Sequence, residues 1–534
     1  MKLLLSLFLL FAAGCQQCGQ KCSRQQTLSP KQHLRLNIPA DPVTFDPRKG
    51  GDIISSMVHF LLYDGLTRLK ADGQVELALA DRIDVSEDGM TYTFHLREAY
   101  WSNGDRVTAV DFEKSWKAML DPLFPAPNAQ LLYPIKNAEQ AKRGLIPLSE
   151  VGLWSLNEKT FVVQLQEPTP YFLELISFCV FFPVNISIDP LWENHIEENL
   201  ICSGPFLLKK WDRQSELVLM KNPHFHRSKG ILLDEIHVSV VASETTALQM
   251  YQKGELDILG NPLMSLPTEA LPELAKSGEL QIRPVGATTF CSFNVNRFPF
   301  NHPKMRKAFA YAINRQEIVQ NITQLAEEPA LGIVPMTVKK GGRSVFFQDA
   351  DTVHARALFQ EALSELGLKE TDLPTLTYYY QTAELHHQVA QALQQQWEKA
   401  LGVKVQLQSL PQKTLMDVLK TRDYLFAQTY WMVQYNDPMN ILERFKYLHN
   451  VKNYPGWENP QFIDCLVRSN RAKDRETRLS IIEEAEQIML EEMPLAPIFH
   501  WSSAFVAKDY IKMFNLAPIG NGFFEQVCIA PKEE

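Results

Sequence analysis

Several features of common protein classes are missing from this sequence of 534 residues. After the first dozen residues, no apolar run reaches the ~20 residues that a membrane-spanning helix needs. There is no low-complexity tract and no internal repeat, which excludes a linker-like or solenoid protein. Like charges do not cluster, and the formal net charge of −9 offers no basic surface for nucleic acid. These absences leave a large globular chain of ordinary composition.

Motifs of the common hydrolases and nucleotide-binding enzymes are also missing. We find no H-E-x-x-H zinc motif, no G-x-S-x-G nucleophile elbow and no phosphate-binding P-loop. We therefore expect a protein that is not an enzyme, with no catalytic residue, no cofactor and no bound metal. A peptidase of the cell envelope is the enzymatic alternative.

The N-terminus has the pattern of a targeting segment. Residues 3–11 are apolar, and Ala12-Ala13-Gly14-Cys15 matches the cleavage site of a bacterial lipoprotein signal. We expect removal of residues 1–14, a tether over 15–33, and lipidation of Cys15, which would anchor the protein to a bacterial membrane. A plain secretory signal is the alternative.

The eight cysteines fall into two groups. Cys15, Cys18 and Cys22 form a C-x-x-C-x-x-x-C run inside the tether, where metal binding is the alternative to lipidation. In an oxidising compartment we expect some of the others to pair, although the spacing does not decide which. These scattered cysteines are Cys179, Cys202, Cys291, Cys465 and Cys528.

The stretch from 62 to 122 predicts a strand, a turn and a helix. Apolar residues at 92, 94 and 96 alternate with polar ones, which is typical of a half-buried strand. Thr108, followed three residues later by Asp111, predicts a capping box at a helix start. Apolar residues at 112, 116 and 119 place one face of this helix in the core, and Pro122 follows its end.

Periodicity in the second half predicts alternating strands and helices. A strand at 376–380, an amphipathic helix at 389–401 and a strand at 403–407 complete a βαβ unit. Two further amphipathic helices are predicted at 358–366 and 479–489. The chain is therefore an α/β protein, and its length favours two or three lobes, because one core seldom serves so many residues.

The runs LYDGLTRL, VSEDGMTYTFHLREAYWSNGD and VTAVDFEKSWKAMLDP follow one another in this order. They resemble the extracytoplasmic solute-binding proteins of family 5, in particular the oligopeptide-binding members that serve peptide ABC importers. Further matching segments extend from about residue 34 to 531: LRLNIPADPVTFDP, SGPFLLKKW, ALQMYQKGELDIL and FNVNRFPFNHPKMRKAFAYAINRQEIV.

The resemblance implies a bilobed α/β periplasmic-binding-protein (Venus-flytrap) fold with an additional subdomain. The first lobe would be discontinuous and comprise 34–70, 203–285 and 500–531. The extra subdomain would span 71–202 and the second lobe 286–499. The lobes of such a receptor close on a ligand held between them.

The resemblance also implies a function and partners. The protein would be a monomeric, lipid-anchored receptor in the periplasm or cell envelope. It would capture short peptides and deliver them to an ABC permease and ATPase complex, with no role for nucleic acid.

The sequence departs from the family pattern where the relatives hold the ends of the peptide. In the relatives, the ligand's main chain pairs with strands, and an Asp in the segment Trp-x-x-Asp-Tyr-x-x-Pro contacts its α-ammonium. Here Trp431 to Pro438 keep this frame, but Gln434 takes the place of the Asp. The relatives also carry a basic residue three positions before the Trp, near the peptide's carboxylate end, and here that position is Gln428. His386 matches a His that lines the carboxylate end in the relatives.

The missing carboxylate has an energetic consequence. A buried charge that loses its partner typically costs ~3–5 kcal/mol, so an α-ammonium facing Gln434 needs another anion. Either Asp437 or Asp423 substitutes, or the ligand is not held by a free amine.

Ten residues are candidates for ligand binding: Trp431, Gln434, Tyr435, Asp437, Gln428, His386, Phe290, Cys291, Phe293 and Ile53. Each group has a structural alternative. Trp431 and Tyr435 could be packing residues, Asp437 could start a helix, and the three strand residues 290, 291 and 293 could face the core. The two glutamines also leave open a non-peptide ligand, such as a metal chelate, haem, glutathione or a sugar.

Overall fold

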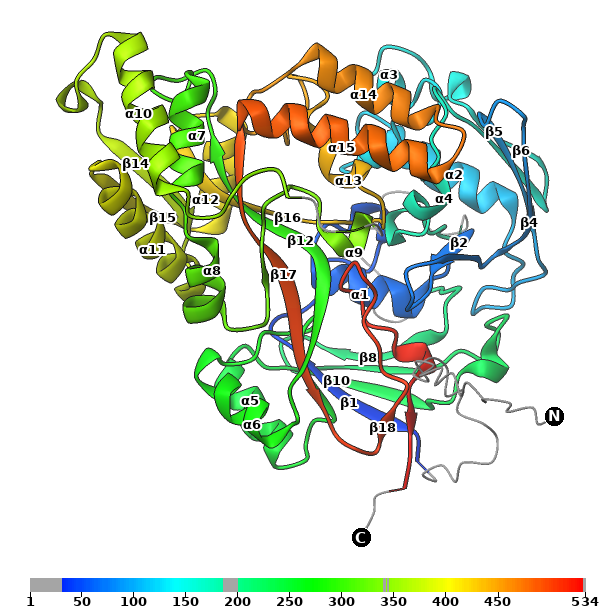
Figure 1. Ribbon diagram of the computed structural model, residues 1–534. Coiled ribbons are helices and arrows are strands. Elements are labelled where there is room, and N and C mark those ends of the chain that lie inside the picture. Colours follow the sequence, from blue (N-terminus) through cyan, green and yellow to red (C-terminus); the bar gives the residue numbers. More distant parts are fainter. Residues whose placement is uncertain (1–30, 186–199, 340–341, 343–344, 532–534) are drawn as a thin grey trace, which may run out of the picture.

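The computed structural model of the chain describes residues 31–185, 200–339, 342 and 345–531 (Figure 1). The predicted signal sequence, Cys15 with its predicted lipid, and nearly all of the tether lie outside the described residues. Within the described part, no helix combines the length and apolar character needed to cross a membrane.

The first lobe is built on a four-stranded sheet in which the first pair of strands is parallel and the others are antiparallel. In the first strand, Leu34, Leu36 and Ile38 are fully buried, as the alternation of a half-buried strand requires. In order across the sheet, the strands are β1 (His33–Ile38), β10 (Glu235–Val240), β9 (Glu216–Lys221) and β8 (Phe206–Asp212). Its helices are α1 (Ile53–Leu62), α5 (Glu244–Gln252) and α6 (Leu271–Ser277).

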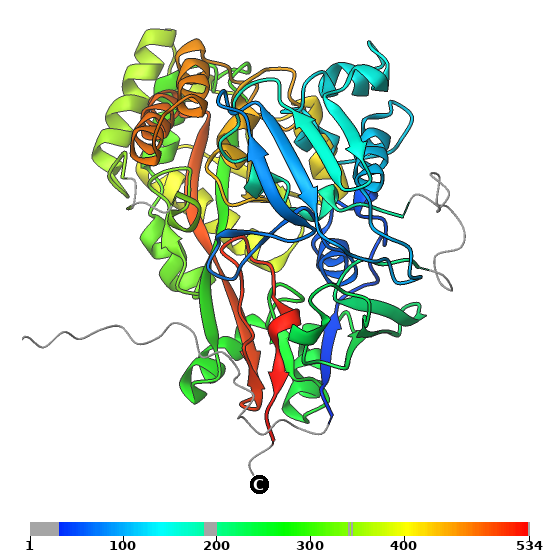
Figure 2. The ribbon, with the colours of Figure 1, turned by 90° about the vertical axis from the view of Figure 1, so that its right-hand side faces the viewer.

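The extra subdomain has its own antiparallel sheet, which lies above the first-lobe sheet in Figure 2. Trp116 of the helix α2 (Ala109–Leu120) packs edge-on against Phe161 of the sheet, with 5.3 Å between ring centroids. In order across the sheet, the strands are β4 (Ala80–Val85), β5 (Thr91–Leu96), β7 (Thr160–Gln164) and β6 (Leu153–Asn157). Two short helices, α3 (Ala138–Lys142) and α4 (Phe172–Leu175), complete it.

The second lobe is a mixed sheet with helices around it. In order across this sheet, the strands are β11 (Ile258–Gly260), β17 (Leu495–Ala507), β12 (Gln281–Phe293), β16 (Phe426–Met432), β14 (Leu376–Gln381) and β15 (Val405–Leu410), with β13 (Glu328–Pro329) beside β17. The helices are α7 (Pro303–Tyr311), α8 (Arg315–Ile318), α9 (Met336–Lys339), α10 (Thr352–Leu366), α11 (Glu384–Leu401), α12 (Gln412–Thr421), α13 (Met439–Leu442), α14 (Pro460–Asn470) and α15 (Arg475–Glu492).

Short elements connect these units. They are the hairpin β2 (Thr67–Leu69) and β3 (Val75–Leu77), the pair β18 (Ile511–Lys512) and β19 (Cys528–Ile529), the 3₁₀ turns η1 (Pro47–Lys49), η2 (Ala129–Leu132), η3 (Leu148–Glu150), η4 (Cys179–Phe181), η5 (Ser228–Gly230), η6 (Thr268–Ala270), η8 (Glu370–Asp372), η9 (Glu443–Phe445) and η10 (Phe524–Gln526), and the π-helical turn η7 (Val319–Thr323).

The strands β12 and β17 belong to both lobes. Each is 13 residues long, and the two run side by side through the molecule (Figure 1). The end of β17 near Ala507 pairs with β11, whereas the opposite end of β12 pairs with β16. The domain boundaries predicted at 285/286 and 499/500 therefore fall inside continuous strands. A register shift between Pro284 and Thr288 interrupts the ladder close to these positions.

An aromatic cluster forms the core of the second lobe. The ring of Phe426 in β16 packs against Phe293, Phe300, Tyr378 and Trp397, with centroids 4.9 to 6.4 Å apart. Trp397 is fully buried, and its Nε1 donates a 2.9 Å hydrogen bond to the Phe309 carbonyl. The cluster fixes the start of β16 inside the lobe.

The local predictions are confirmed in the elements that the sequence singled out. β5 shows the expected alternation of buried and half-buried residues. The Thr108 amide donates to the Asp111 carboxylate at 2.7 Å, as the capping box requires. β14, α11 and β15 form the predicted βαβ unit with parallel pairing, and Gly402 ends α11 with a φ of 76°.

The prediction of disulfide pairing is wrong for four of the scattered cysteines. Cys179, Cys202, Cys291 and Cys465 are buried, unpaired thiols in the described structure. Burial raises the pKa of Cys179 and of Cys202 to about 12. Their apolar neighbours indicate that they act as small packing residues.

Replacing Trp397 with alanine should lower the free energy of unfolding by ~3–5 kcal/mol, because the change empties a buried indole site. Trp154, which is 37% exposed on β6, is the control, and its replacement should cost less than about 0.5 kcal/mol. Urea unfolding followed by circular dichroism measures both. Equal losses would contradict a core role for the aromatic cluster.

Glu486 of α15 is a fully buried carboxylate that holds the segment before α9. Its Oε1 accepts hydrogen bonds from the amides of Ile333 and Val334, the second at 2.9 Å. Burial raises the pKa of Glu486 to about 7. In the unfolded chain the pKa of this carboxyl is near 4.5. At pH values between 4.5 and 7, Glu486 therefore keeps its proton in the folded state and has lost it in the unfolded state.

Stability should therefore fall as the pH rises from about 4.5 to 7, by roughly 3 kcal/mol from this group alone. The variant Glu486→Gln keeps an acceptor for both amides and cannot ionise, so its stability should lose that part of the pH dependence. Urea unfolding of both proteins at pH 5 and pH 7.5 measures the difference. An unchanged pH dependence in the variant would disprove the assignment.

Candidate functional site

The segment from Trp431 to Pro438 leaves the core at the end of β16 and leads into α13. β12 pairs with β16 as far as Met432, whereas β14 pairs with it only at Phe426 and Ala427. From Gln428 onward, β12 is therefore the only strand among the described residues that pairs with β16. The opposite edge of β16 keeps main-chain groups that an extended chain can pair with.

Gln434 lies where the second lobe approaches the other two units. Its Nε2 donates to the Asn128 Oδ1 at 3.3 Å, and the Asn128 Nδ2 donates to the Gly50 carbonyl at 3.0 Å. Gly50 precedes α1, whose first residue, Ile53, is 53% exposed. One amide side chain thus links the loop of the first lobe to the segment that follows β16.

Trp431 is half-buried and held on its polar edge by Asn440. The Trp431 Nε1 donates to the Asn440 Oδ1 at 2.7 Å, and the backbone N–H of Gln434 donates to the same oxygen at 3.3 Å. The Arg444 guanidinium lies 3.8 Å from the centroid of the indole, and the Lys452 Nζ lies 5.2 Å from it. Packing therefore explains only part of the environment of Trp431, because two cations also lie against its ring.

Asp437 is engaged by another side chain. Arg478 of α15 donates to both of its carboxylate oxygens at 2.7 Å, and both side chains are about 10% exposed. Asp423 pairs with Arg297 at 2.9 Å in an exposed position. The hypothesis that either residue replaces the missing carboxylate is not supported, because each already neutralises an arginine.

Tyr435 joins the second lobe to the extra subdomain. Its ring stacks on Tyr171 with 5.4 Å between centroids and 4° between the ring planes. Burial raises the pKa of both phenols well above the usual value. Asn436 adds a 2.9 Å hydrogen bond to the Gly73 carbonyl, and Lys446 pairs with Glu167 at 3.0 Å. Tyr435 therefore makes a packing contact in this structure.

His386 of α11 and Gln428 of β16 lie near Tyr430, two residues after Gln428 in the strand. The imidazole of His386 stacks on Tyr430 with centroids 6.1 Å apart, and Tyr430 packs against Trp501 at 5.2 Å. Burial lowers the pKa of His386. Gln428 is 4% exposed, and neither atom of its amide has a hydrogen-bond partner among the described residues. These two residues offer polar groups without a charge.

Phe290, Cys291 and Phe293 are at most 1% exposed. Phe293 belongs to the aromatic cluster, and the Cys291 thiol interacts with the Tyr378 hydroxyl inside the lobe. The prediction that these three residues line the floor of the cleft is therefore not supported. Their side chains fill the interior instead, which is the alternative that their strand position left open.

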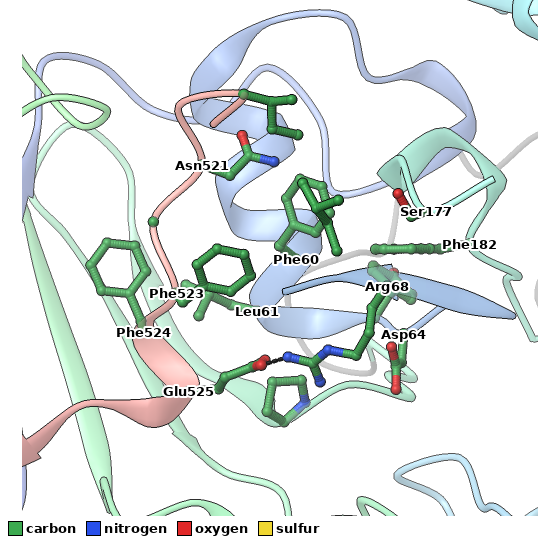
Figure 3. A pocket seen from close by; sticks show the side chains of 15 residues that line it. Phe60, Leu61, Asp64, Arg68, Ser177, Phe182, Asn521, Phe523, Phe524 and Glu525 are labelled. Atoms are coloured by element: carbon green, nitrogen blue, oxygen red, sulfur yellow. Dashed lines mark ion pairs between the residues drawn. The ribbon is translucent and has the colours of Figure 1, made fainter. Parts of the chain in front are cut away.

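Two hollows were considered as the ligand site. The first, shown in Figure 3, has a volume of about 40 Å³ and lies between α1 and the segment 519–525, where Arg68 pairs with Glu525. It has room for water only. The second is open and about 550 Å³ in volume, and lies between the extra subdomain and the second lobe beside Asp437 and Arg478. The ion pair of Asp437 with Arg478 forms part of its lining.

Sequence reasoning missed four residues that shape the end of β16. Asn128 and Asn440 gave no signal, because single asparagines are common in loops and helix starts. Arg444 and Lys452 stand 6 and 14 positions after Pro438, the last residue of the recognised frame. The sequence does not show which side chains surround them, so it gave no reason to single them out.

Comparisons with known proteins agree with the fold. Residues 74–453 match the family model described as bacterial extracellular solute-binding proteins, family 5 Middle. The chain is 36% identical over 529 residues to the oligopeptide-binding protein OppA of Bacillus subtilis (strain 168), covering 98% of this chain and 97% of that protein. It is 32% identical over 529 residues to the dipeptide-binding protein DppE of the same organism, covering 97% and 96%.

A solved structure gives the same result. The Haemophilus influenzae OppA complex with RPPGFSPFR matches with a TM-score of 0.80 at 25% sequence identity, covering 94% of this chain and 100% of that chain. The predicted bilobed α/β fold and the predicted family are confirmed. This chain belongs to the bacterial extracellular solute-binding proteins of family 5.

Proposed function

We propose that this protein is a receptor that binds short peptides between its lobes and delivers them to an ABC importer. The observation that carries the proposal is the position of the Trp431–Pro438 frame, at the open edge of β16 and opposite the Gly50 loop. The relatives that cover nearly the whole chain are named for binding oligopeptides and dipeptides. We infer that the protein performs no catalytic step, since its family consists of solute-binding proteins.

Main-chain pairing would provide affinity that does not depend on peptide sequence. The edge of β16 from Gln428 to Met432 would hold one side of an extended peptide. The loop from Gly50 to Ile53 would hold the other side, and the half-buried Trp431 would supply an apolar surface. Among the ten candidates, we propose Trp431, Gln434, Gln428, His386 and Ile53 as ligand contacts.

Closure would bring these two sides together. Since β12 and β17 run through both lobes, a bend near the register shift at Pro284 would move one lobe against the other. Asn128, which donates to the Gly50 carbonyl, also accepts a hydrogen bond from Gln434, and we propose that such contacts between the two sides form on closure. They would favour the closed state that the importer recognises.

Location and anchoring complete the proposal. The family is extracellular, and we propose that lipidated Cys15 holds the mature monomer at a bacterial membrane, next to its permease. Metabolic labelling with a palmitate analogue would test the anchor, and Cys15→Ser should abolish the label.

Native mass spectrometry of the purified protein should reveal bound peptides. We expect a series of masses that fit short peptides of several sequences, because main-chain pairing does not select side chains. Release and sequencing of the bound molecules checks this. A single non-peptide mass, or a protein that ignores peptide mixtures, would overturn the peptide assignment and leave the fold intact.

Replacing Trp431 with alanine should weaken peptide binding by about ten-fold or more, because the change removes an aromatic surface at the centre of the cleft. Isothermal titration calorimetry with a peptide released from the wild type measures the loss. Trp154→Ala, at the surface of the extra subdomain, is the control and should keep full affinity. Wild-type affinity in a folded Trp431→Ala protein would remove this segment from the site.

A further inference from the structure

Two cations lie beside Trp431, and neither has a carboxylate partner in the part of the chain that the structure describes. Arg444 is 7% exposed, and its guanidinium stacks 3.8 Å from the indole centroid. Lys452 places its Nζ 5.2 Å from the same centroid. Among the described residues, no acidic side chain acts on either of them. Buried cations are normally paired, so this pair requires an explanation.

The hydrogen bonds of the two cations are incomplete. Arg444 donates from Nη2 to the Lys452 carbonyl at 3.0 Å, and its buried Nε has no partner among the described residues. A guanidinium has five N–H donors. With the Gln130 side chain turned so that its oxygen faces Lys452, the Lys452 Nζ donates to this oxygen at 2.8 Å. Gln130 is a neutral amide of the extra subdomain. Donors remain for an anion.

The electrostatic surroundings of Lys452 are unfavourable for a second cation. Burial, and then the charges of Arg444 and Lys420, lowers the pKa of Lys452 to about 8. Burial lowers the pKa of Arg444 to about 10. Both groups are therefore cationic at neutral pH, although burial disfavours the charged state. A bound anion would remove the repulsion.

The acidic residues nearby are already engaged. Asp437 forms its two hydrogen bonds with Arg478, and Glu167 pairs with Lys446. Glu443 accepts a 3.0 Å hydrogen bond from the Tyr171 hydroxyl. None of these carboxylates neutralises the two cations on Trp431.

The cations lie at the ligand cleft. Trp431 and Gln434 share Asn440 as a hydrogen-bond acceptor, and Gln434 is in contact with Asn128 of the opposite side. We infer that Arg444 and Lys452 form an anion subsite on Trp431 that binds a carboxylate of the peptide. The inference rests on the proposed peptide-binding function. It reverses the charge expected at this end, because the two cations would repel an α-ammonium and the neutral Gln434 supplies no charge to hold it.

The carboxylate can come from two sources, an acidic side chain or the C-terminus of the peptide. We would measure binding by isothermal titration calorimetry with alanine pentapeptides that carry glutamate at each position in turn. Each peptide would be compared with its glutamine counterpart, and each would be made as the free acid and as the C-terminal amide. This set separates the two sources.

We expect one of two results. Either the peptide with glutamate at one position binds about ten-fold tighter than its glutamine counterpart, or the free acids bind about ten-fold tighter than the amides. A difference of about ten-fold is typical of a hydrogen bond to a charged group. This preference should disappear in Lys452→Gln. Lys508→Gln is the control, because Lys508 also lies over an aromatic ring, 3.9 Å from the Tyr251 centroid, but in the first lobe. The control should keep the preference.

The outcomes are distinguishable. Peptides that bind without any preference for a carboxylate, or with a preference that survives in Lys452→Gln, would overturn the anion subsite and leave peptide binding intact. The absence of binding by any peptide in the set would overturn both. Thermal melting of each variant verifies folding, and Arg444→Lys offers a second variant that keeps the charge but removes the planar donors.

The pH gives an independent test. Lys452 loses its charge as the pH rises through its pKa of about 8. The groups that act on it are Arg444 and Lys420, and Tyr454 lies next to Arg444. The preference for the carboxylate should therefore be full at pH 7 and shrink by pH 9.5. A preference that stays constant over this range would contradict the role of Lys452.

Discussion

The pairing of β12 with β17 is the constraint on which the rest of this receptor depends. Two strands of 13 residues extend roughly 40 Å, far enough to carry parts of both lobes. β11 extends the ladder at one end and β16 at the other. Because the lobes share these strands, their relative motion is confined to bending and twisting of one ladder. The cleft can therefore open without losing the register of its walls.

The segment after β16 divides its residues between two tasks. Tyr435, Asn436 and Asp437 hold the segment against the extra subdomain and α15. Trp431 and Gln434 remain half-buried and face neighbours that are polar or cationic. A frame that is rigid at one end and accessible at the other can present main-chain groups in a fixed orientation. The fixed end also explains why the frame is recognisable although the residue at the Asp position has changed.

The sequence predicted local structure well where one short pattern determines the outcome. The capping box at Thr108, the alternation in β5 and the βαβ unit around α11 depend on neighbours in the chain. It predicted poorly where the outcome depends on distant partners. Asp437 looked available because Arg478, 41 positions away, is not visible in its pattern. Phe293 looked equally suited to a cleft or a core, since alternation identifies a face but not what covers it. The cation pair on Trp431 was missed for the same reason.

The buried thiols have a consequence for the life of the chain outside the cytoplasm. A thiol reacts with oxidants and disulfides as its thiolate, and the pKa of about 12 for Cys179 and Cys202 leaves almost none at neutral pH. At these two positions the folded receptor is therefore chemically silent toward the oxidants of its surroundings, whereas the unfolded chain is not. The interval between export and folding is the time during which wrong cross-links form. Rapid burial of these sulfur atoms, rather than their pairing, protects the protein.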